Sequence, residues 1–339
     1  MKIGTHDLSE KVFIIAEIGN NHEGNISLAK EMVWAAKEAG VDAVKFQTFQ
    51  TEHFISRHDK ERFKRLKGFE LTQDAFCSLA SESSKAGITF LSTPFDIGSV
   101  NALGPLVPAF KIASSENTFY PLIEDVARRG KPILLSTGLA DLFVIKRAQE
   151  IIEGVWKQQN VSPGLCLMHC VCNYPAESSE LNLNAIPLLR STFGCEVGYS
   201  DHSLGIEAAV LAVAVGARVI EKHFTLNKNY SDFRDHKISA DLPEMREMVK
   251  AIRSAEIALG VFEKKLQDSE SQAVSQLRRH IAVVRDMSVG EKVAKQDITW
   301  LRGVGGFPAG NESEVLGHSL KQAVLAGDFL RKDHFQRLK

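Results

Sequence analysis

Two histidines stand directly after short apolar runs that are typical of β-strands. His202 closes the segment 198–202 (GYSDH), and His223 closes the segment 219–223 (VIEKH). A helical pattern over residues 206–215 separates them, so the two runs could be parallel neighbours whose side chains leave the same edge of one sheet. Two neutral imidazoles at one edge can share a divalent metal. Taken singly, each histidine fits better as an isolated side chain that hydrogen-bonds near a strand end. A shared metal site becomes the better interpretation only if the other predicted strand ends also carry polar residues.

The elements that would hold such residues alternate along the first 260 residues. Eight β-rich runs are expected at 13–18, 43–46, 89–92, 109–112, 132–136, 166–170, 196–199 and 218–222. Each is followed by a helical pattern, at 28–39, 73–86, 97–106, 120–129, 141–155, 184–193, 206–215 and 243–259. Eight strand–helix units in succession predict an α/β fold, the closed (β/α)8 or TIM barrel.

The alternation stops near residue 262. Residues 263–278 are polar and charged, which predicts a linker between a barrel domain at 1–262 and a second domain at 279–339. That last segment has short apolar runs divided by seven glycines and is expected to be small and mostly β. A long charged stretch between residues 46 and 72 is expected to be a lid, an interface or a solvated excursion.

Composition limits the classes of partner. The chain has 339 residues, and 41 basic against 42 acidic side chains give no reason to expect nucleic acid or an anionic membrane as partner. No apolar run reaches the roughly 18 residues of a membrane helix, and the charged start does not resemble a secretory signal, so a cytoplasmic protein is expected. The five cysteines are an odd number and fit reduced thiols. The tight Cys170-Val171-Cys172 spacing does not favour zinc.

Polar side chains gather at the predicted carboxyl ends of the strands, where barrel enzymes place their active sites. They are Glu17, Lys45, Gln47, Thr93, Lys111, Ser114, Glu116, Ser136, Tyr174, Ser200, His202 and His223. Two lysines with several hydroxyls supply the charges and short donors that a small phosphorylated substrate needs. The hydroxyls are equally suited to capping turns, and the carboxylates to pairing with the lysines or to transferring protons.

Seven segments in order along the chain resemble the motifs of the sialic acid synthase family. They are 16–24 (AEIGNNHEG), 44–48 (VKFQT), 92–95 (STPF), 111–116 (KIASSE), 135–138 (LSTG), 198–202 (GYSDH) and 221–225 (EKHFT). Residues 279–339 resemble the antifreeze-like, or SAF, domain of these synthases. The resemblance implies a transferase of sialic acid biosynthesis that condenses phosphoenolpyruvate with an open-chain N-acetylmannosamine-type sugar, giving a nine-carbon α-keto acid and phosphate.

The resemblance also assigns roles. It implies that His202 and His223 are catalytic and hold a divalent metal, manganese first, with magnesium or cobalt as alternatives. The implied phosphoenolpyruvate-binding residues are Lys45, Thr93, Lys111, Ser114, Ser136 and Ser200. The implied sugar-binding residues are Glu17, Gln47, Tyr174, Asp235 and Arg302. Glu116 is the implied catalytic carboxyl that handles the attacking water or the proton. In this family Arg302 would come from the small domain of the partner in a domain-swapped homodimer.

Two departures from the family leave the sugar open. Residues 231–236 (SDFRDH) lack the usual Gly-Pro before the aspartate, and Cys172 stands where Asn or Ser is usual. The sugar could be N-acetylmannosamine, its 6-phosphate, mannose, or a hexose of the legionaminic or pseudaminic type. Other classes of protein are also open. Lys45, Lys111 or Lys222 could serve a Schiff-base aldolase, and an inactive barrel could carry a carbohydrate- or ice-binding carboxyl-terminal module.

Overall fold

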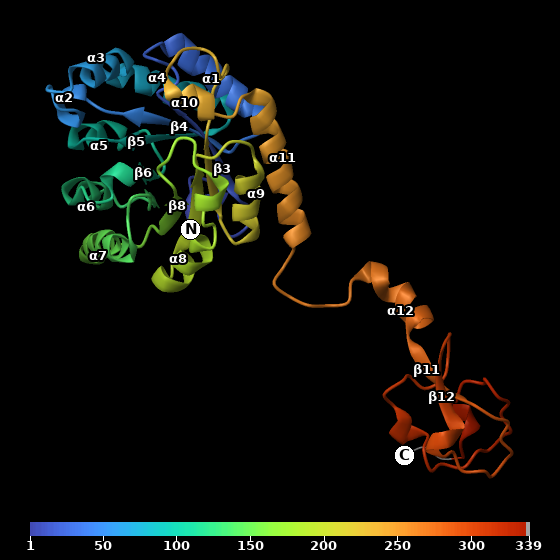
Figure 1. The fold of residues 1–339 in the computed structure, drawn as a ribbon. Helices are drawn as coiled ribbons and strands as arrows, with labels where there is room; N and C mark the ends of the chain where they lie inside the picture. The colour runs from blue at the N-terminus through green and yellow to red at the C-terminus, as the bar shows by residue number, and fades with distance from the viewer. Residues whose placement is uncertain (337–339) are drawn as a thin grey trace. The chain divides into compact units, whose positions relative to one another are not determined.

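The computed structural model describes residues 1–336 and contains two compact units, Met1–Gly260 and a second one that begins at Val261. Figure 1 shows both, and each is described by itself. No helix among residues 1–336 combines the length and apolar character that crossing a membrane requires.

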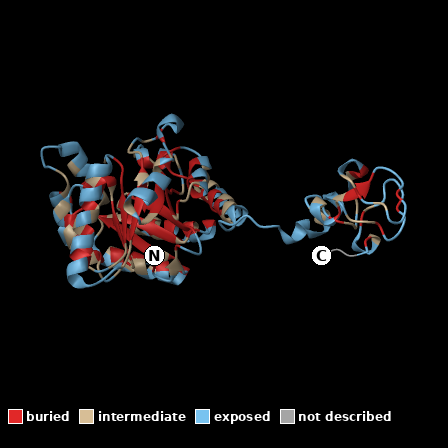
Figure 2. Cartoon of the chain, turned by 90° about the horizontal axis from the view of Figure 1, so that it is seen from below, coloured by how far each residue is buried: buried red, intermediate tan, exposed pale blue. Residues whose placement is uncertain are grey.

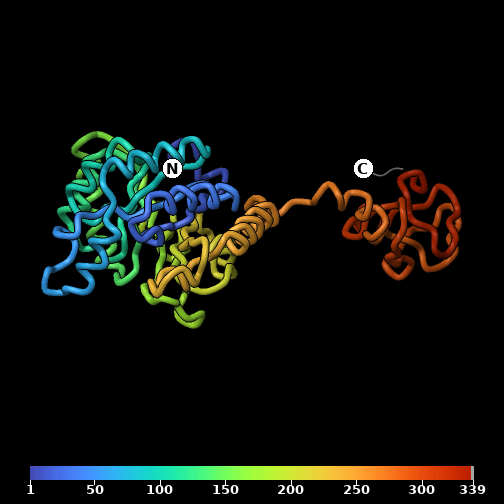
Figure 3. The backbone as a smooth tube through the Cα atoms, turned by 90° about the horizontal axis from the view of Figure 1, so that it is seen from above, coloured from blue at the N-terminus to red at the C-terminus, as the bar shows by residue number. Residues whose placement is uncertain are grey.

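Eight parallel strands form the centre of the first unit and confirm the predicted barrel. They are β3 (Phe13–Gly19), β4 (Ala43–Thr48), β5 (Thr89–Pro94), β6 (Phe110–Ile112), β7 (Ile133–Ser136), β8 (Leu165–Cys170), β9 (Glu196–Asp201) and β10 (Val219–His223). The hydrogen-bonded order is β5-β4-β3-β10-β9-β8-β7-β6. β5 and β6 lie in contact at the two ends of that order, so the sheet curls into a nearly closed barrel. Helices α4 to α9 follow one another around this unit in sequence order (Figure 1), and Figure 3 shows the backbone of the same unit from above.

The eight predicted helices also form, one after each strand. They are α1 (Ile26–Ala39), α4 (Gln73–Ala86), α5 (Ile97–Leu103), α6 (Tyr120–Arg128), α7 (Leu142–Gln159), α8 (Ala185–Phe193), α9 (Glu207–Ala214) and α11 (Leu242–Leu259). Gly40 and Gly87 end α1 and α4 at φ 88° and 69°, a left-handed conformation that glycine adopts without a Cβ clash. Asp241 and Glu244 form a capping box that starts α11.

Five short elements of the first unit were not expected. A hairpin of β1 (Lys2–Ile3) and β2 (His6–Asp7) precedes the barrel, and its Ile3 packs with the apolar side chains inside the barrel. The charged excursion after β4 contains α2 (Thr51–Phe54) and α3 (Lys60–Phe69). The loop after β10 contains α10 (Arg234–Ile238).

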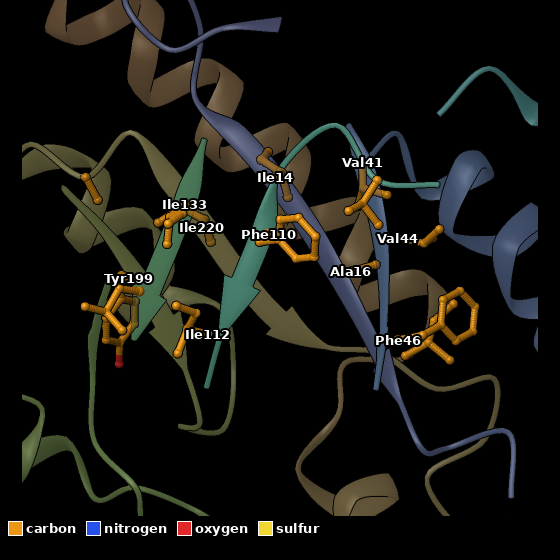
Figure 4. Packing of buried hydrophobic residues seen from close by; sticks show 14 of the residues in the cluster. Ile14, Ala16, Val41, Val44, Phe46, Phe110, Ile112, Ile133, Tyr199 and Ile220 are labelled. Atoms are coloured by element: carbon orange, nitrogen blue, oxygen red, sulfur yellow. The ribbon is translucent and has the colours of Figure 1, made fainter. Parts of the chain in front are cut away.

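Side chains of each strand alternate between two apolar clusters. Ile14 and Ala16 of β3 face the helices, in the large cluster that Figure 4 shows, whereas Phe13 and Ile15 face the barrel interior. Figure 2 shows the result, a buried sheet surrounded by helices whose outer faces are exposed. The inward-facing apolar cluster fills the half of the barrel at the amino-terminal ends of the strands. The half at their carboxyl ends is therefore open to polar side chains.

The second unit is small, as predicted. β11 (Arg279–Val283) pairs antiparallel with β12 (Ile298–Arg302), around a core of its own that includes Ile281, Val315 and Leu320. A 3-10 turn (Asp268–Glu270) and α12 (Ser271–Leu277) occupy most of the segment that composition alone predicted as a linker.

Candidate active site

The alternation of strand side chains explains how the functional residues reach the barrel interior. Two residues beyond each inward apolar side chain, the same face of the strand turns polar. Ile15 is followed by Glu17, Ala43 by Lys45, and Leu91 by Thr93. The pattern repeats with Lys111, Ser136, Cys170, Ser200 and Glu221. The apolar half of the barrel therefore forms the floor of a polar pocket at the carboxyl ends of the strands.

Eleven of the fourteen predicted site residues line one cavity of about 350 Å³. They are Glu17, Lys45, Gln47, Thr93, Lys111, Ser114, Ser136, Tyr174, Ser200, His202 and His223. Asp235 lines an adjoining cavity. Glu116 is buried in the 3-10 helix Ser114–Glu116 and lines neither cavity, and burial raises the pKa of its carboxyl. Arg302 is exposed at the end of β12, in the second unit.

Buried charges of both signs occupy the cavity floor. Lys45 Nζ lies 2.8 Å from Glu17 Oε2 and 3.6 Å from Glu221 Oε2 and donates to Thr93 Oγ1 over 2.9 Å. Lys111 Nζ lies 3.9 Å from Glu221 Oε1. Burial would raise the pKa of Glu221, but the two lysines outweigh it and hold this pKa at about 2. Both lysines are therefore held beside Glu221, whose carboxylate remains ionised at pH 7, and they face the cavity.

Glu221 is a site residue that the sequence reading did not select. It accepts a hydrogen bond from Ser200 over 2.9 Å and joins the two lysines. A signal was present, because Glu221 stands two residues before His223 on the same face of β10. Glu17 differs from it, since burial outweighs its contact with Lys45 and raises its pKa to about 7.

Besides Glu221, two hydrogen-bond acceptors fix the position of the Lys111 ammonium group. Its Nζ donates to Ser136 Oγ over 2.6 Å and to the carbonyl of Ile112 over 3.1 Å. Ser114 Oγ accepts from the amide of Gly138 over 3.1 Å. A Cβ on Gly138 would stand 2.7 Å from Ser114 Oγ and 2.5 Å from Cys172 Sγ, so this turn requires glycine to bring the hydroxyl and the thiol together.

The two histidines do meet. Their ring centroids lie 5.5 Å apart, and the ring of Tyr174 stacks on His202 at 4.2 Å. Burial lowers the pKa of His202 to about 4 and that of His223 to about 3, so both rings are neutral at pH 7. His202 Nδ1 lies 2.8 Å from the carbonyl oxygen of Val171 and must donate to it, which leaves Nε2 with a lone pair.

This pair fits a divalent metal by its chemistry. His223 Nδ1 is buried and has no hydrogen-bond partner among residues 1–336, which is costly unless something else satisfies it. Within the same residues no group of three or more His, Cys, Asp and Glu side chains gathers as a metal cluster. Two histidines alone leave most coordination positions to water and substrate oxygens, as in catalytic sites.

A second cavity, of about 540 Å³, adjoins the first. Seven residues line both cavities and stand at the junction: Gln47, Arg62, Phe95, Ser115, Tyr174, His223 and Arg234. The guanidinium of Arg234 lies 4.7 Å from the ring centre of Tyr174, and its Nε lies 3.4 Å from Asp235 Oδ1. We refer to the first cavity as the lysine chamber and to the second as the arginine chamber, because Arg62, Arg65 and Arg234 line the latter.

Lys222 is not part of either chamber. It is almost fully buried, and its Nζ donates to Asp201 Oδ2 over 2.7 Å and to the carbonyl of Ser203 over 2.8 Å. Both charged residues occupy strand positions that face away from the barrel interior. Of the three strand-end lysines that a Schiff-base aldolase could use, only Lys45 and Lys111 face a cavity.

The thiol of Cys172 lines the lysine chamber and provides a prediction that needs no knowledge of substrate. A hydrogen bond from Cys170 lowers the pKa of Cys172 to about 6, so its thiolate predominates at pH 7. Alkylation by iodoacetamide should then be close to its plateau rate at pH 7, whereas a thiol of pKa about 8.5 reaches only a few per cent of its plateau there. Mass spectrometry of each cysteine peptide between pH 5 and 9 measures this, with exposed Cys77 as the internal reference. A Cys172 profile that still rises steeply between pH 8 and 9 would contradict the prediction.

Comparison with known proteins agrees with this fold and site. The NeuB family matches residues 32–264, and the SAF domain matches residues 278–336. The barrel and its polar mouth thus define a synthase-type barrel enzyme with a small carboxyl-terminal SAF domain. The chain belongs to the NeuB family.

Relatives named as synthases match most of the chain. The N,N'-diacetyllegionaminic acid synthase of Legionella pneumophila is 38% identical over 338 residues, which cover 96% of this chain and 94% of that protein. The N-acetylneuraminate-9-phosphate synthase of Mus musculus is 32% identical over 301 residues, covering 85% of this chain and 82% of that one. The solved N-acetylneuraminic acid synthetase of Leptospira borgpetersenii, in complex with citrate, has a TM-score of 0.73 at 37% identity and covers 78% of this chain and 90% of that one.

Proposed function

We propose that this chain condenses phosphoenolpyruvate with the open-chain aldehyde of a mannosamine-type sugar, giving a nonulosonic acid and phosphate. The observation that carries the proposal is one cavity in which two buried lysines stand beside a pair of neutral histidines. Relatives named as synthases of legionaminic acid, pseudaminic acid and N-acetylneuraminate 9-phosphate support it. The nonulosonic acid formed is sialic, legionaminic or pseudaminic in type.

In the proposed complex, phosphoenolpyruvate occupies the lysine chamber. Lys45 and Lys111 offset the charge of its phosphate and carboxylate, Ser114 and Ser136 offer hydroxyl donors, and Ser200 would do so after turning its hydroxyl away from Glu221. The floor carboxylates hold the lysines at fixed positions, so little reorganisation accompanies charge movement during the reaction. Carbon 3 of the enol then forms a bond to the aldehyde carbon, water adds at carbon 2, and the bond from carbon 2 to the phosphate oxygen breaks.

The aldehyde would lie at the junction of the chambers. We propose that His202 and His223 hold a divalent metal, manganese first, with magnesium or cobalt as alternatives. Such an ion would supply Lewis acidity at the aldehyde oxygen. Gln47, Tyr174 and Asp235 line the arginine chamber and would bind the sugar hydroxyls. Glu116, with its raised pKa, remains the proposed proton carrier for the attacking water.

The assay is phosphate release from phosphoenolpyruvate with manganese and a panel of sugars. The expected result is release with at least one mannosamine-type sugar, its loss on adding a chelator, and a nine-carbon keto acid by mass spectrometry. No release with any sugar would exclude the condensation. Borohydride treatment with substrate tests the aldolase alternative. A covalent adduct on Lys45 or Lys111 without metal dependence would favour that alternative.

We also propose that the protein acts as a domain-swapped homodimer in the cytoplasm. The five cysteines are all free, which fits a reducing compartment. Arg302, exposed on the second unit, would then reach the sugar in the partner's barrel.

Replacing Arg302 by alanine should raise the KM for the sugar by about tenfold or more, because a charge-assisted contact is lost, and should change the KM for phosphoenolpyruvate far less. Steady-state kinetics in each substrate measure the two constants. Arg278→Ala, at an exposed arginine just before β11, is the matched control. Equal changes in both constants would argue against a sugar contact.

A further inference from the structure

We propose that the sugar accepted by this site carries a phosphate monoester at the end remote from its aldehyde, and that Arg62 and Arg65 of α3 bind this phosphate. The inference rests on the proposed condensation and goes beyond it, because it names the class of sugar. The observations that carry it are the composition of α3, the way α3 is anchored, and the charge balance of the arginine chamber.

The arginines and the lysines of α3 lie on different parts of the helix surface. Its sequence, KERFKRLKGF, has five basic residues and one acidic residue. Arg62 and Arg65 are three positions apart and share a face with Leu66, and all three line the arginine chamber. The three lysines of the helix line neither chamber. Arginine is thus found where a planar fork can meet a ligand, and lysine where a charge only needs water.

The arginines are carried by an anchored helix. Leu66 is buried and packs in one cluster with Phe49 and Phe95, which follow β4 and β5. The side chain of Asp59 caps the start of α3 by accepting from the amide of Arg62. The backbone from which the two arginines extend is therefore fixed against the barrel, so binding an anion does not require the helix to be ordered first.

The charge balance of the arginine chamber is positive. Three arginines and two aspartates line it. Arg234 lies in ion-pair distance of Asp235, but within residues 1–336 neither Arg62 nor Arg65 makes an ion pair or a side-chain hydrogen bond. Both side chains are exposed, so water solvates them in the free protein, and a neutral sugar bound beside them would gain no charge-charge contact from either guanidinium. A phosphate monoester supplies up to two negative charges and oxygens in the geometry that arginine binds with two parallel hydrogen bonds.

The two chambers separate two anion sites. Lys45 and Lys111 line only the lysine chamber, and Arg65 lines only the arginine chamber. His223 lines both, so an aldehyde held there would direct the rest of the sugar chain away from the lysines and toward Arg65. Arg62 lines both chambers, so the phosphate of phosphoenolpyruvate would bind at the lysines and the phosphate of the sugar at Arg65, at opposite ends of one continuous site with Arg62 between them.

The test compares N-acetylmannosamine 6-phosphate with N-acetylmannosamine and with a neutral diacetamido hexose of the legionaminic type. The full-length protein with manganese is assayed by phosphoenolpyruvate consumption and by the mass of the product, which retains the sugar phosphate. We expect kcat/KM for the phosphorylated sugar to exceed that for either neutral sugar by about 100-fold or more, since two charge-assisted contacts are gained.

Variants on one helix then assign the preference to the arginines. Arg65→Gln should lower the ratio of kcat/KM for the phosphorylated over the neutral sugar by about tenfold, and Arg62→Gln/Arg65→Gln by about 100-fold. Lys64→Gln removes a charge from the same helix outside the chamber and should leave the ratio unchanged. Thermal unfolding checks that each variant is folded.

The outcomes are distinct. Turnover of a neutral sugar at equal or higher kcat/KM would overturn the phosphate inference while leaving the condensation standing. So would arginine variants that slow both sugars equally, or a Lys64→Gln effect as large as that of Arg65→Gln. No turnover of phosphoenolpyruvate with any of the three sugars would instead overturn the proposed function itself.

Discussion

Replacing His223 by alanine is expected to remove the metal and the activity together. His223 is buried at the junction of the two chambers, is neutral at pH 7 and has a ring nitrogen without a partner among residues 1–336. With one imidazole left, His202 alone is a weak site for a divalent ion. Loss of Lewis-acid activation should lower kcat by about a thousandfold or more.

The measurement pairs metal analysis with kinetics on the same preparation. Wild-type protein and variant are stripped with a chelator, reloaded with manganese, desalted and analysed for bound metal per chain, and then assayed. His58→Ala, at an exposed histidine outside both chambers, is the matched control and should retain metal and rate. Unchanged metal content and rate in His223→Ala would refute the metal assignment. Lost activity with full metal content would move the role of His223 from metal binding to contact with the substrate.

The sequence predicted the barrel well because its periodicities are strong. Each of the eight strands is a run of buried side chains, and each of the eight helices after them has an apolar face, so the alternation of the two periods marks both. The β1–β2 hairpin was missed because two-residue strands contain no period to detect. The helix inside 263–278 was missed because a polar segment with no buried residue gives no amphipathic signal.

The site was predictable where chain order places a residue at a strand end, and less so elsewhere. Lys45, Lys111 and His223 lie on β4, β6 and β10, strands that the sequence predicted, and were found for that reason. Arg62 and Arg65 lie in a charged excursion far from any strand end, and only the packing of Leu66 onto the barrel brings them to the chamber. Such a contact depends on tertiary structure, which a single sequence does not encode as a local pattern.

The sequence prediction also did not distinguish the strand-end lysines that face the cavity from the one that is paired with an aspartate outside it. Lys111 and Lys222 both stand at strand ends, yet Lys111 faces the cavity and Lys222 is bound to Asp201 behind the sheet. Counting alternate positions from the apolar floor separates the two, since Lys111 is two residues after Ala109 and Lys222 is three after Val219. The same count selects Glu221. A stricter use of strand register would therefore have identified the floor carboxylate and set aside one aldolase lysine.

Replacing Lys111 by methionine is expected to have an effect of similar size, but on phosphoenolpyruvate rather than on metal. Methionine fills a similar volume without charge, so the cavity keeps its shape. The substrate loses a buried cation that a charge-assisted contact needs, and Glu221 loses the largest of the interactions that lower its pKa. We expect kcat/KM for phosphoenolpyruvate to fall by about a thousandfold, with bound manganese unchanged.

Two further variants separate the role in binding from a role in folding. Lys131 is also partly buried, but its Nζ donates to the carbonyls of Gly104 and Val107 outside the chambers, so Lys131→Met should lower the melting temperature with little effect on phosphoenolpyruvate. Adding Glu221→Gln to Lys111→Met removes the carboxylate that has lost a partner, so stability should recover while substrate affinity does not. If the double variant instead regained phosphoenolpyruvate turnover, Lys111 would serve only to balance Glu221, and the substrate's negative charge would be held by Lys45 alone.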